Sequence, residues 1–353
     1  MSDADQASPC SIPQLNLILP SRFSLLLTSP GLGTGIACGI ASAIFYTLSN
    51  IALRQATSVD PFFVAAIKAA PTVLCLAPVF LVQRWKYRDA KSASITHSWS
   101  AAIRFAGVSL VGQVVGNGAF QIALGSIGLA ASVPIAMGTL LIGGAILGRL
   151  FLGEPVNATK IVSIAMLVIA VVVLTQSQAN NADSIAQDPK QGVDSQWSVL
   201  NAPPWVGAAC AIACGAAYAF FSSQMRKFMQ QGMPAFGAMW ISGVVGTVAL
   251  WAITISRDGF EPMQTADASQ WRAMIAAGIF NFVAFLAIST ALRVLPVVAV
   301  HLLNASQVAM AATAGVVMFH EAVTGRLIVG LALTMAGLLV LTAPIVIQKW
   351  DRR

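Results

Sequence analysis

Long apolar stretches, separated by short polar ones, recur along almost the whole chain. A helix that crosses the hydrocarbon core of a bilayer needs about 20 mostly apolar residues. The first half of the chain offers five such stretches: Gly31–Leu53, Pro61–Val82, Ile103–Leu124, Gly128–Leu150 and Val156–Thr175. The second half offers five more: Trp205–Met225, Pro234–Ser256, Met274–Leu295, Val297–Phe319 and Val323–Ile347. The pattern predicts an all-α polytopic membrane protein with ten transmembrane helices.

The polar segments between these stretches are short and leave no room for a globular enzymatic domain outside the bilayer. Residues 1–30 lack the basic start and apolar core of a cleaved signal peptide and predict a tail. Residues 176–203 are polar and predict a linker. We therefore expect a first five-helix repeat at residues 31–175, a second at residues 204–347, and a short tail at residues 348–353.

Composition supports the membrane interpretation and excludes a soluble domain. The chain is 57% hydrophobic and 9% charged, whereas soluble domains carry about 25% charged residues. Its net charge of +7 could indicate nucleic-acid binding. With the N-terminus in the cytoplasm, however, 14 of the 20 Lys and Arg residues fall on the cytoplasmic side and 5 on the other. This positive-inside bias predicts a multi-pass protein of the cell (inner) membrane with both termini cytoplasmic and no nucleic-acid partner.

The two halves of the chain are similar in sequence. Tyr46 and Arg54 match Tyr218 and Arg226 at an offset of 172 residues, together with several small and apolar positions. Near the end of each half the offset becomes 167 and pairs Glu154 with Glu321. Repeats with an odd number of spans insert in opposite orientations, which is a common construction of secondary transporters. Duplication retained only for packing is the alternative.

The sequence resembles the EamA-like branch of the drug/metabolite transporter superfamily. The resemblance rests on Gly128–Thr175, which contains Gly153-Glu154-Pro155, and on Ala291–Thr342, which contains His320-Glu321-Ala322. A Gly-Glu pair commonly closes the fourth span of each repeat in that family, so His320 departs from the pattern. The resemblance covers about Gly31–Ile347. It implies a ten-helix carrier of small metabolites, often an exporter, and leaves the substrate open.

Lys68 is the one formal charge expected deep within a span. It lies seven residues past Pro61, about 10 Å along a helix that rises 1.5 Å per residue. An ammonium at such a depth costs about 2.5–3.5 kcal/mol unless it reaches water or a partner. We expect Lys68 to face a cavity and to attract a carboxylate or phosphate. Snorkelling of the side chain to the interface is the alternative.

Polar side chains on five other spans are further candidates for substrate binding. Amides or hydroxyls facing lipid would be unsatisfied, so they are expected in a cavity or in helix contacts, and both interpretations stay open. The third span has three amide side chains at a spacing of four residues, which places them on one face of a helix. The first span of each half has two polar side chains at matching positions of the repeat. These candidates are Gln113, Asn117 and Gln121; Tyr46 and Asn50; Tyr218 and Ser222; Asn281; and His301, Asn304 and Gln307.

All 13 acidic residues lie in expected loops or tails. A buried carboxylate that carries protons in coupled transport is therefore not expected, and coupling through His301 has weak support. Glu154 lies where the fifth span begins and is followed by Pro155, which is favourable helix-capping and dipole chemistry. We expect the same structural role for Glu321.

Together these features predict a secondary transporter that works by alternating access. The expected substrate is a small metabolite, an amino acid or a related anionic or zwitterionic compound, and export is inferred from the family resemblance alone. The cavity is expected between spans 1, 3, 6, 8 and 9, with Lys68 from span 2. We expect no enzyme activity, no cofactor and no metal site; a homodimer is left open. A channel and an intramembrane enzyme acting on lipid are the alternatives.

Overall fold

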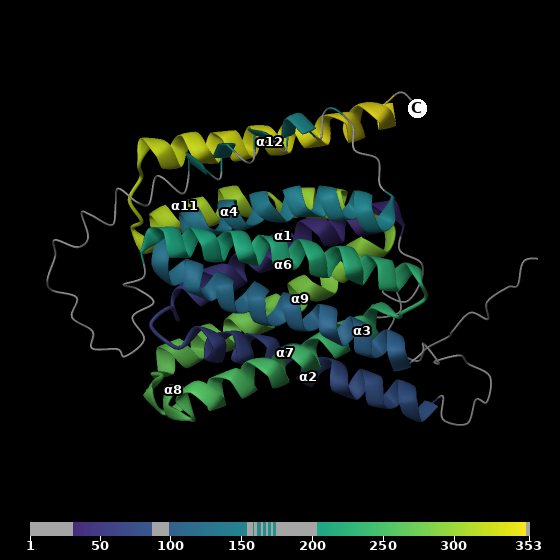
Figure 1. Ribbon diagram of the computed structural model, residues 1–353, viewed down its shortest axis with the longest axis vertical. Coiled ribbons are helices and arrows are strands. Elements are labelled where there is room, and N and C mark those ends of the chain that lie inside the picture. The colour runs from purple at the N-terminus through teal and green to yellow at the C-terminus, as the bar shows by residue number, and fades with distance from the viewer. Residues whose placement is uncertain are drawn as a thin grey trace, which may run out of the picture.

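Long helices packed side by side make up the protein (Figure 1). The computed structural model describes residues 31–86, 99–153 and 203–350, with scattered positions between 158 and 173. Within these residues there is no strand. The first half contains α1 (Leu32–Arg54), α2 (Pro61–Lys86), α3 (Trp99–Leu110), the π-helix η2 (Val111–Asn117) and α4 (Gly118–Leu152). The second half contains α6 (Pro204–Gln230), α7 (Ala235–Asp258), the short α8 (Glu261–Thr265), α9 (Ala268–Val294), α10 (Val297–Asn304), α11 (Gln307–Phe319) and α12 (Gly325–Trp350).

The expected membrane spans correspond to helices wherever the structure describes them. Six helical stretches are long and apolar enough to cross a bilayer, and Gln307–Phe319 and Gly325–Gly337 are shorter apolar helices. The expected span at Val156–Thr175 lies mostly outside the described residues. The protein is thus a multi-pass membrane protein, and the total of ten spans stays a prediction.

A break at Gly128 divides the longest apolar stretch, Trp99–Leu152, which is helical over 54 residues. A straight helix of that length would measure about 80 Å, far more than a bilayer's hydrocarbon core. Gly128 has φ 75° and ψ 177°, a conformation that glycine alone adopts readily. It therefore ends one helix and starts the next, as the expected boundary at this residue requires.

Two expected spans are not regular α-helices. Span 3 is interrupted by η2, which contains Gln113 and Asn117, and such π-segments occur frequently at functional sites. Span 9 is divided into α10 and α11 by a turn at residues 305–306. Apolar periodicity could not indicate either interruption, because both segments have the composition of a continuous helix.

The two halves pack against each other through equivalent helices. The first helix of the first half, α1, packs on α9, and the first helix of the second half, α6, packs on α4. Both contacts are close: Ser49 Oγ donates a hydrogen bond to the carbonyl of Ala277 over 2.9 Å. A Cβ atom on Gly215 would collide with the carbonyl oxygen of Ala136. Helices α2 and α7 also pack together.

Arg54 and Arg226, which match in the sequence repeat, make equivalent contacts. Arg54 Nη1 donates to the carbonyl of Leu124 over 3.0 Å. Arg226 Nη1 donates to the carbonyls of Leu292, over 2.8 Å, and Leu295. Each arginine thereby binds carbonyl groups near the C-terminal end of another helix of its own half, where such groups lack helical donors. The sequence repeat is therefore also a repeat of tertiary contacts.

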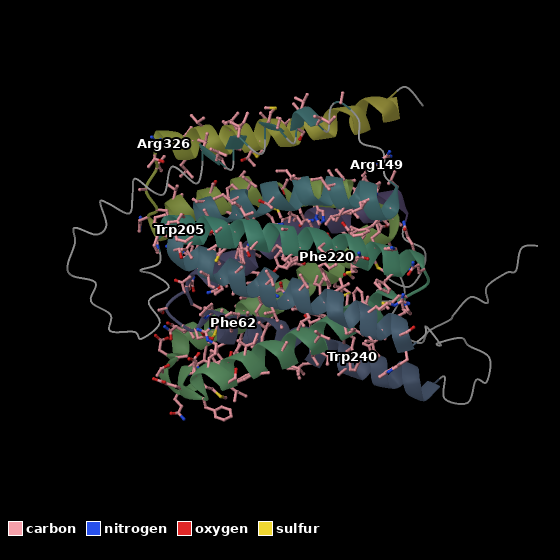
Figure 2. All side chains as sticks on the ribbon, in the orientation of Figure 1. Phe62, Arg149, Trp205, Phe220, Trp240 and Arg326 are labelled. Atoms are coloured by element: carbon pink, nitrogen blue, oxygen red, sulfur yellow. The ribbon has the colours of Figure 1, made fainter. Side chains whose placement is uncertain are left out.

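The ends of the helices agree with the expected course of the chain. Trp205, near the start of α6, and Arg326, near the start of α12, lie at one end of the bundle (Figure 2). Arg149, near the end of α4, lies at the opposite end (Figure 2). This is the arrangement that the predicted order of crossings requires. Arg54, the last residue of α1, lies at the same end as Arg326, because it contacts Glu321. This end, which also carries the link between α1 and α2, is called the Arg54 end below.

Candidate functional site

A cavity of about 140 Å³ lies between the two halves of the protein. Helices α1, α2, α4, α6, α9, α10 and α11 and the π-helix η2 all contribute to its lining. Eleven of the twelve residues predicted from the sequence line it: Tyr46, Asn50, Lys68, Gln113, Asn117, Tyr218, Ser222, Asn281, His301, Asn304 and Gln307. The structure therefore brings together polar groups that are up to 261 residues apart, from Tyr46 to Gln307.

Lys68 is buried at the cavity wall, with 5% of its surface exposed. Its Nζ donates a hydrogen bond to Asn117 Oδ1 over 2.8 Å. Snorkelling to the interface is therefore wrong, because the side chain turns inward to an amide. An ammonium has three N–H donors, and the bond to Asn117 uses one of them.

Asn117 connects Lys68 to a longer chain of hydrogen bonds. Its Oδ1 also accepts from the hydroxyl of Tyr218 over 2.6 Å, and its Nδ2 donates to Gln113 Oε1 over 2.6 Å. Gln113 Nε2 then donates to Ser242 Oγ over 2.8 Å. Each amide in this chain is oriented by partners from both halves, so the ammonium of Lys68 is held in a defined position.

A second polar group comes from α10 and α11. His301 Nε2 and Ser222 Oγ are 2.8 Å apart. Asn304 Nδ2 donates to Ser42 Oγ over 2.8 Å, and Gln307 Nε2 donates to Asn304 Oδ1 over 2.9 Å. His301, Asn304 and Gln307 line the cavity, and Asn304 also joins helices of the two halves through Ser42. Cavity lining and helix contact, which the sequence left as alternatives, are combined here.

The matched polar pairs of the sequence repeat meet in the same cavity. Tyr46 and Asn50 reach it from α1, while Tyr218 and Ser222 reach it from α6. The repeated sequence positions thus line one cavity. This convergence is what a binding site at the interface of two structural repeats requires.

Gln121 is the predicted site residue that the structure places elsewhere. It is buried, and its Nε2 donates to the carbonyls of Leu53, over 3.2 Å, and Ala56, over 3.5 Å. It therefore stabilises the end of α1, where carbonyl groups lack helical donors. The spacing of four predicted that Gln121 shares the face of Asn117, but one turn beyond Asn117 the end of α1 lies next to this helix, and its carbonyl groups take the Gln121 amide.

Apolar residues complete the cavity wall, and sequence reasoning missed them. Of the elements that supply these residues, α6 and α9 were expected to line the cavity, whereas the part of α4 after Gly128 was not. In uniformly apolar helices the lining residues carry no distinguishing signal. They are Phe120, Val133, Ala136, Met137, Leu140, Cys214, Phe221, Met225, Phe285, Ile288 and Leu292. Among the described residues no cluster of three or more His, Cys, Asp or Glu side chains could hold a metal ion.

Glu321 caps a helix, but not the helix that follows it in sequence. Its Oε1 and Oε2 accept the backbone N–H groups of Leu129 and Ala130, each over 2.7 Å. Arg54 Nε donates to Oε1 over 3.2 Å. The expectation of a cap at the next helix is therefore wrong in its location: the acid of the second repeat binds a helix start in the first. Glu154, its counterpart, lies outside the described residues.

Comparisons with known proteins agree with this architecture. A solved crystal structure matches with a TM-score of 0.58 over 88% of this chain and 96% of that chain, at 18% sequence identity. At this identity the match shows a shared fold alone. No curated protein is similar enough to this chain to count as a relative.

The family comparison is more specific. The sequence model of the EamA-like transporter family matches twice, over residues 33–176 and 205–343. The two matches coincide with the expected repeats and cover most of the chain. The protein is therefore a member of the EamA-like transporter family, within the drug/metabolite transporter superfamily.

Proposed function

We propose that the protein is a secondary transporter that moves a small organic anion or zwitterion, such as an amino acid, across the cytoplasmic membrane. The observation that carries this proposal is the cavity between the two halves, with the ammonium of Lys68 at its wall. Membership of a transporter family supports it. Export is the direction that the family resemblance favours.

The chemistry of the cavity supports an amphipathic substrate. Lys68 offers unused N–H donors to a carboxylate, and surrounding amides and hydroxyls offer both donors and acceptors. Phenylalanine, methionine and branched aliphatic side chains supply the remaining wall and would contact an apolar body. A few polar groups in a largely apolar cavity are typical of small-molecule sites.

Alternating access is the mechanism that this architecture favours. Two matched halves in opposite orientation can rock about a site at their interface, so that the site opens to one side at a time. The turn between α10 and α11 and the π-helix η2 place irregular backbone next to the cavity. Irregular backbone within spans is tolerated where it borders protein or a cavity.

Reconstitution into liposomes tests the proposal. Liposomes loaded with unlabelled amino acids or monocarboxylates would be diluted into the labelled compound, and counterflow would be recorded. A carrier accumulates label transiently against its gradient, and Lys68→Met protein should not. Absence of counterflow with every compound of these classes would contradict the proposal.

The same assay separates the two alternative functions. A channel would let label equilibrate with no acceleration by substrate on the opposite side. An intramembrane enzyme acting on lipid would leave a chemically changed product, detected by mass spectrometry of the extracted liposomes. Both readouts use the same purified protein, so differences in preparation cannot explain the result.

A further inference from the structure

A carboxylate of the second half closes over a helix start of the first half at the Arg54 end. Glu321 comes from the link between α11 and α12 and reaches Leu129 and Ala130, the first residues after the break in α4. Arg54, the last residue of α1, donates to the same carboxylate. The contact joins elements of both repeats at one end of the bundle.

The contact is electrostatically favourable for a specific reason. Backbone N–H groups at a helix start have no helical acceptors, and the helix dipole places partial positive charge there. A carboxylate that accepts two such N–H groups and an arginine N–H forms three charge-assisted hydrogen bonds, which are stronger than neutral ones. The Glu321 side chain is 13% exposed, so water competes weakly for these bonds.

The backbone around Glu321 is shaped for this position. The Glu321 N–H donates to the carbonyl of Gly315 over 3.1 Å, which folds the link back onto the end of α11. A Cβ on Gly315 would lie 2.5 Å from Glu321 Oε2, and a Cβ on Gly128 would lie 2.6 Å from Oε1. Glycines on both sides of the interface thus make room for the carboxylate.

The contact also lies directly beside the cavity. Asn50, one turn before Arg54 on α1, and Val133, one turn after Ala130 on α4, both line the cavity. Arg54 is fixed to the first half by the carbonyl of Leu124. Release of the Glu321 carboxylate would therefore separate the second half from the first next to the cavity wall.

We propose that Glu321 is the gate at the Arg54 end of the cavity. In the structure described here its carboxylate holds the link between α11 and α12 against the start of the second part of α4, and the cavity opens at this end when the carboxylate leaves that helix start. The inference rests on the proposed alternating-access mechanism. The cap is reversible because the freed N–H groups and carboxylate reach water at this end.

Thiol labelling of a cavity residue tests the gate without any substrate. The five cysteines of the chain are replaced, and Val133→Cys reports access to the cavity. A membrane-impermeant maleimide is added to one side of proteoliposomes. Gln55 is exposed in the turn after α1, at the Arg54 end. Labelling of Gln55→Cys protein therefore identifies the proteoliposomes in which the Arg54 end faces the added maleimide.

The gate predicts a defined order of labelling rates. Glu321→Gln replaces one carboxylate oxygen with an amide N–H that faces a backbone N–H, so labelling should accelerate roughly tenfold. Arg54→Gln keeps both backbone hydrogen bonds of Glu321, so the acceleration should be on the order of threefold. Glu261→Gln, at an exposed acid in α8, should leave the rate unchanged.

The outcomes separate this inference from the proposed transport function. Unchanged labelling in both Glu321→Gln and Arg54→Gln proteins, each eluting as folded protein in size-exclusion chromatography, would overturn the gate. Equal acceleration by Glu261→Gln would also overturn it, because the effect would then be general. Accelerated labelling of a protein that shows no counterflow would support the gate and contradict the proposed transport.

Discussion

Lys68 and Asn117 form a hydrogen bond of 2.8 Å that joins α2 to the π-helix η2 at the wall of the cavity. The bond gives a buried ammonium a neutral partner. A carboxylate partner would have cancelled the charge, whereas the amide leaves it available to a ligand. Hydrogen bonds from Asn117 to Gln113 and from Tyr218 to Asn117 keep the amide oxygen turned toward the ammonium.

Removal of the ammonium should abolish transport while leaving membrane levels intact. Loss of one partner of a buried charged hydrogen bond costs about 2–5 kcal/mol, so Lys68→Ala or Lys68→Met should weaken apparent affinity for an anion roughly hundredfold. Counterflow and immunoblots of membranes measure the two quantities. Lys227→Ala, at a lysine that lies over the Phe151 ring, is the control, and unchanged kinetics in the Lys68 variants would contradict the assignment.

A carboxylate at position 117 should neutralise the site. In Asn117→Asp protein the new charge would pair with Lys68 at about the present distance, so an anionic substrate would lose its attraction to the ammonium. Transport of anions should fall at least tenfold. The exposed Gln55→Glu variant introduces the same charge change outside the cavity and should transport normally. If Asn117→Asp protein transports anions as before, Lys68 does not bind them.

Gly128 and Gly153 both have positive φ, 75° and 68°, but they differ in conformation and in surroundings. Gly153 lies in the left-handed helical region with ψ 17°, where alanine costs about 1–2 kcal/mol, whereas Gly128, with ψ 177°, has a conformation that only glycine adopts readily. A Cβ on Gly128 would also press on Glu321, whereas a Cβ on Gly153 would meet nothing within 4 Å. Gly128→Ala should therefore lower the Tm in detergent more than Gly153→Ala. Equal losses would contradict both the greater strain and the contact with Glu321 at Gly128.

His320 occupies a position that favours glycine. It ends α11 with φ 52°, as Gly153 ends α4 with φ 68°, and the two residues match at the offset of 167. His320→Gly should stabilise the protein by about 1 kcal/mol, because glycine adopts this conformation without steric cost. His320→Ala keeps the side-chain penalty and should give no gain in Tm. A similar gain from both variants would contradict the conformational explanation.

The start of α9 predicts an acid-dependent contribution to stability. Asp267 Oδ1 accepts the backbone N–H groups of Gln270 and Ser269, and Gln270 Oε1 accepts the Asp267 N–H. The hydrogen bond from the Gln270 backbone, with that from the Ser269 side chain, lowers the pKa of Asp267 below its usual 3.8.

Folding lowers the pKa of Asp267, so the contribution of this carboxylate to stability is complete above its ordinary pKa. That contribution is lost as the pH falls through the pKa that Asp267 has in the folded protein. Asp267→Ala should therefore lower the Tm at pH 7, and the difference from the unmodified protein should shrink in acid. Thermal unfolding in detergent across a pH series measures this. A difference that stays constant down to pH 2 would contradict the assignment.

The sequence by itself determined the membrane class, the boundaries of most spans and the two-repeat organisation. Span length and apolar content follow directly from bilayer thickness, so Pro61 and Gly128 are correct boundaries before any packing is known. Polar residues in apolar helices are costly wherever they lie. For that reason Lys68, Asn117 and nine other candidates could be predicted to gather, and they do line one cavity.

Only the tertiary structure decided which partners these groups have. Helical spacing placed Gln121 with Asn117, but the end of α1 packs against the helix at that turn, and Gln121 binds its carbonyls instead of lining the cavity. Glu321 was expected to cap its own helix, yet it caps one in the other repeat because the packed halves bring that helix start closer. Contacts between the halves depend on how two surfaces fit in space, and a linear pattern of apolar and polar residues does not contain that information.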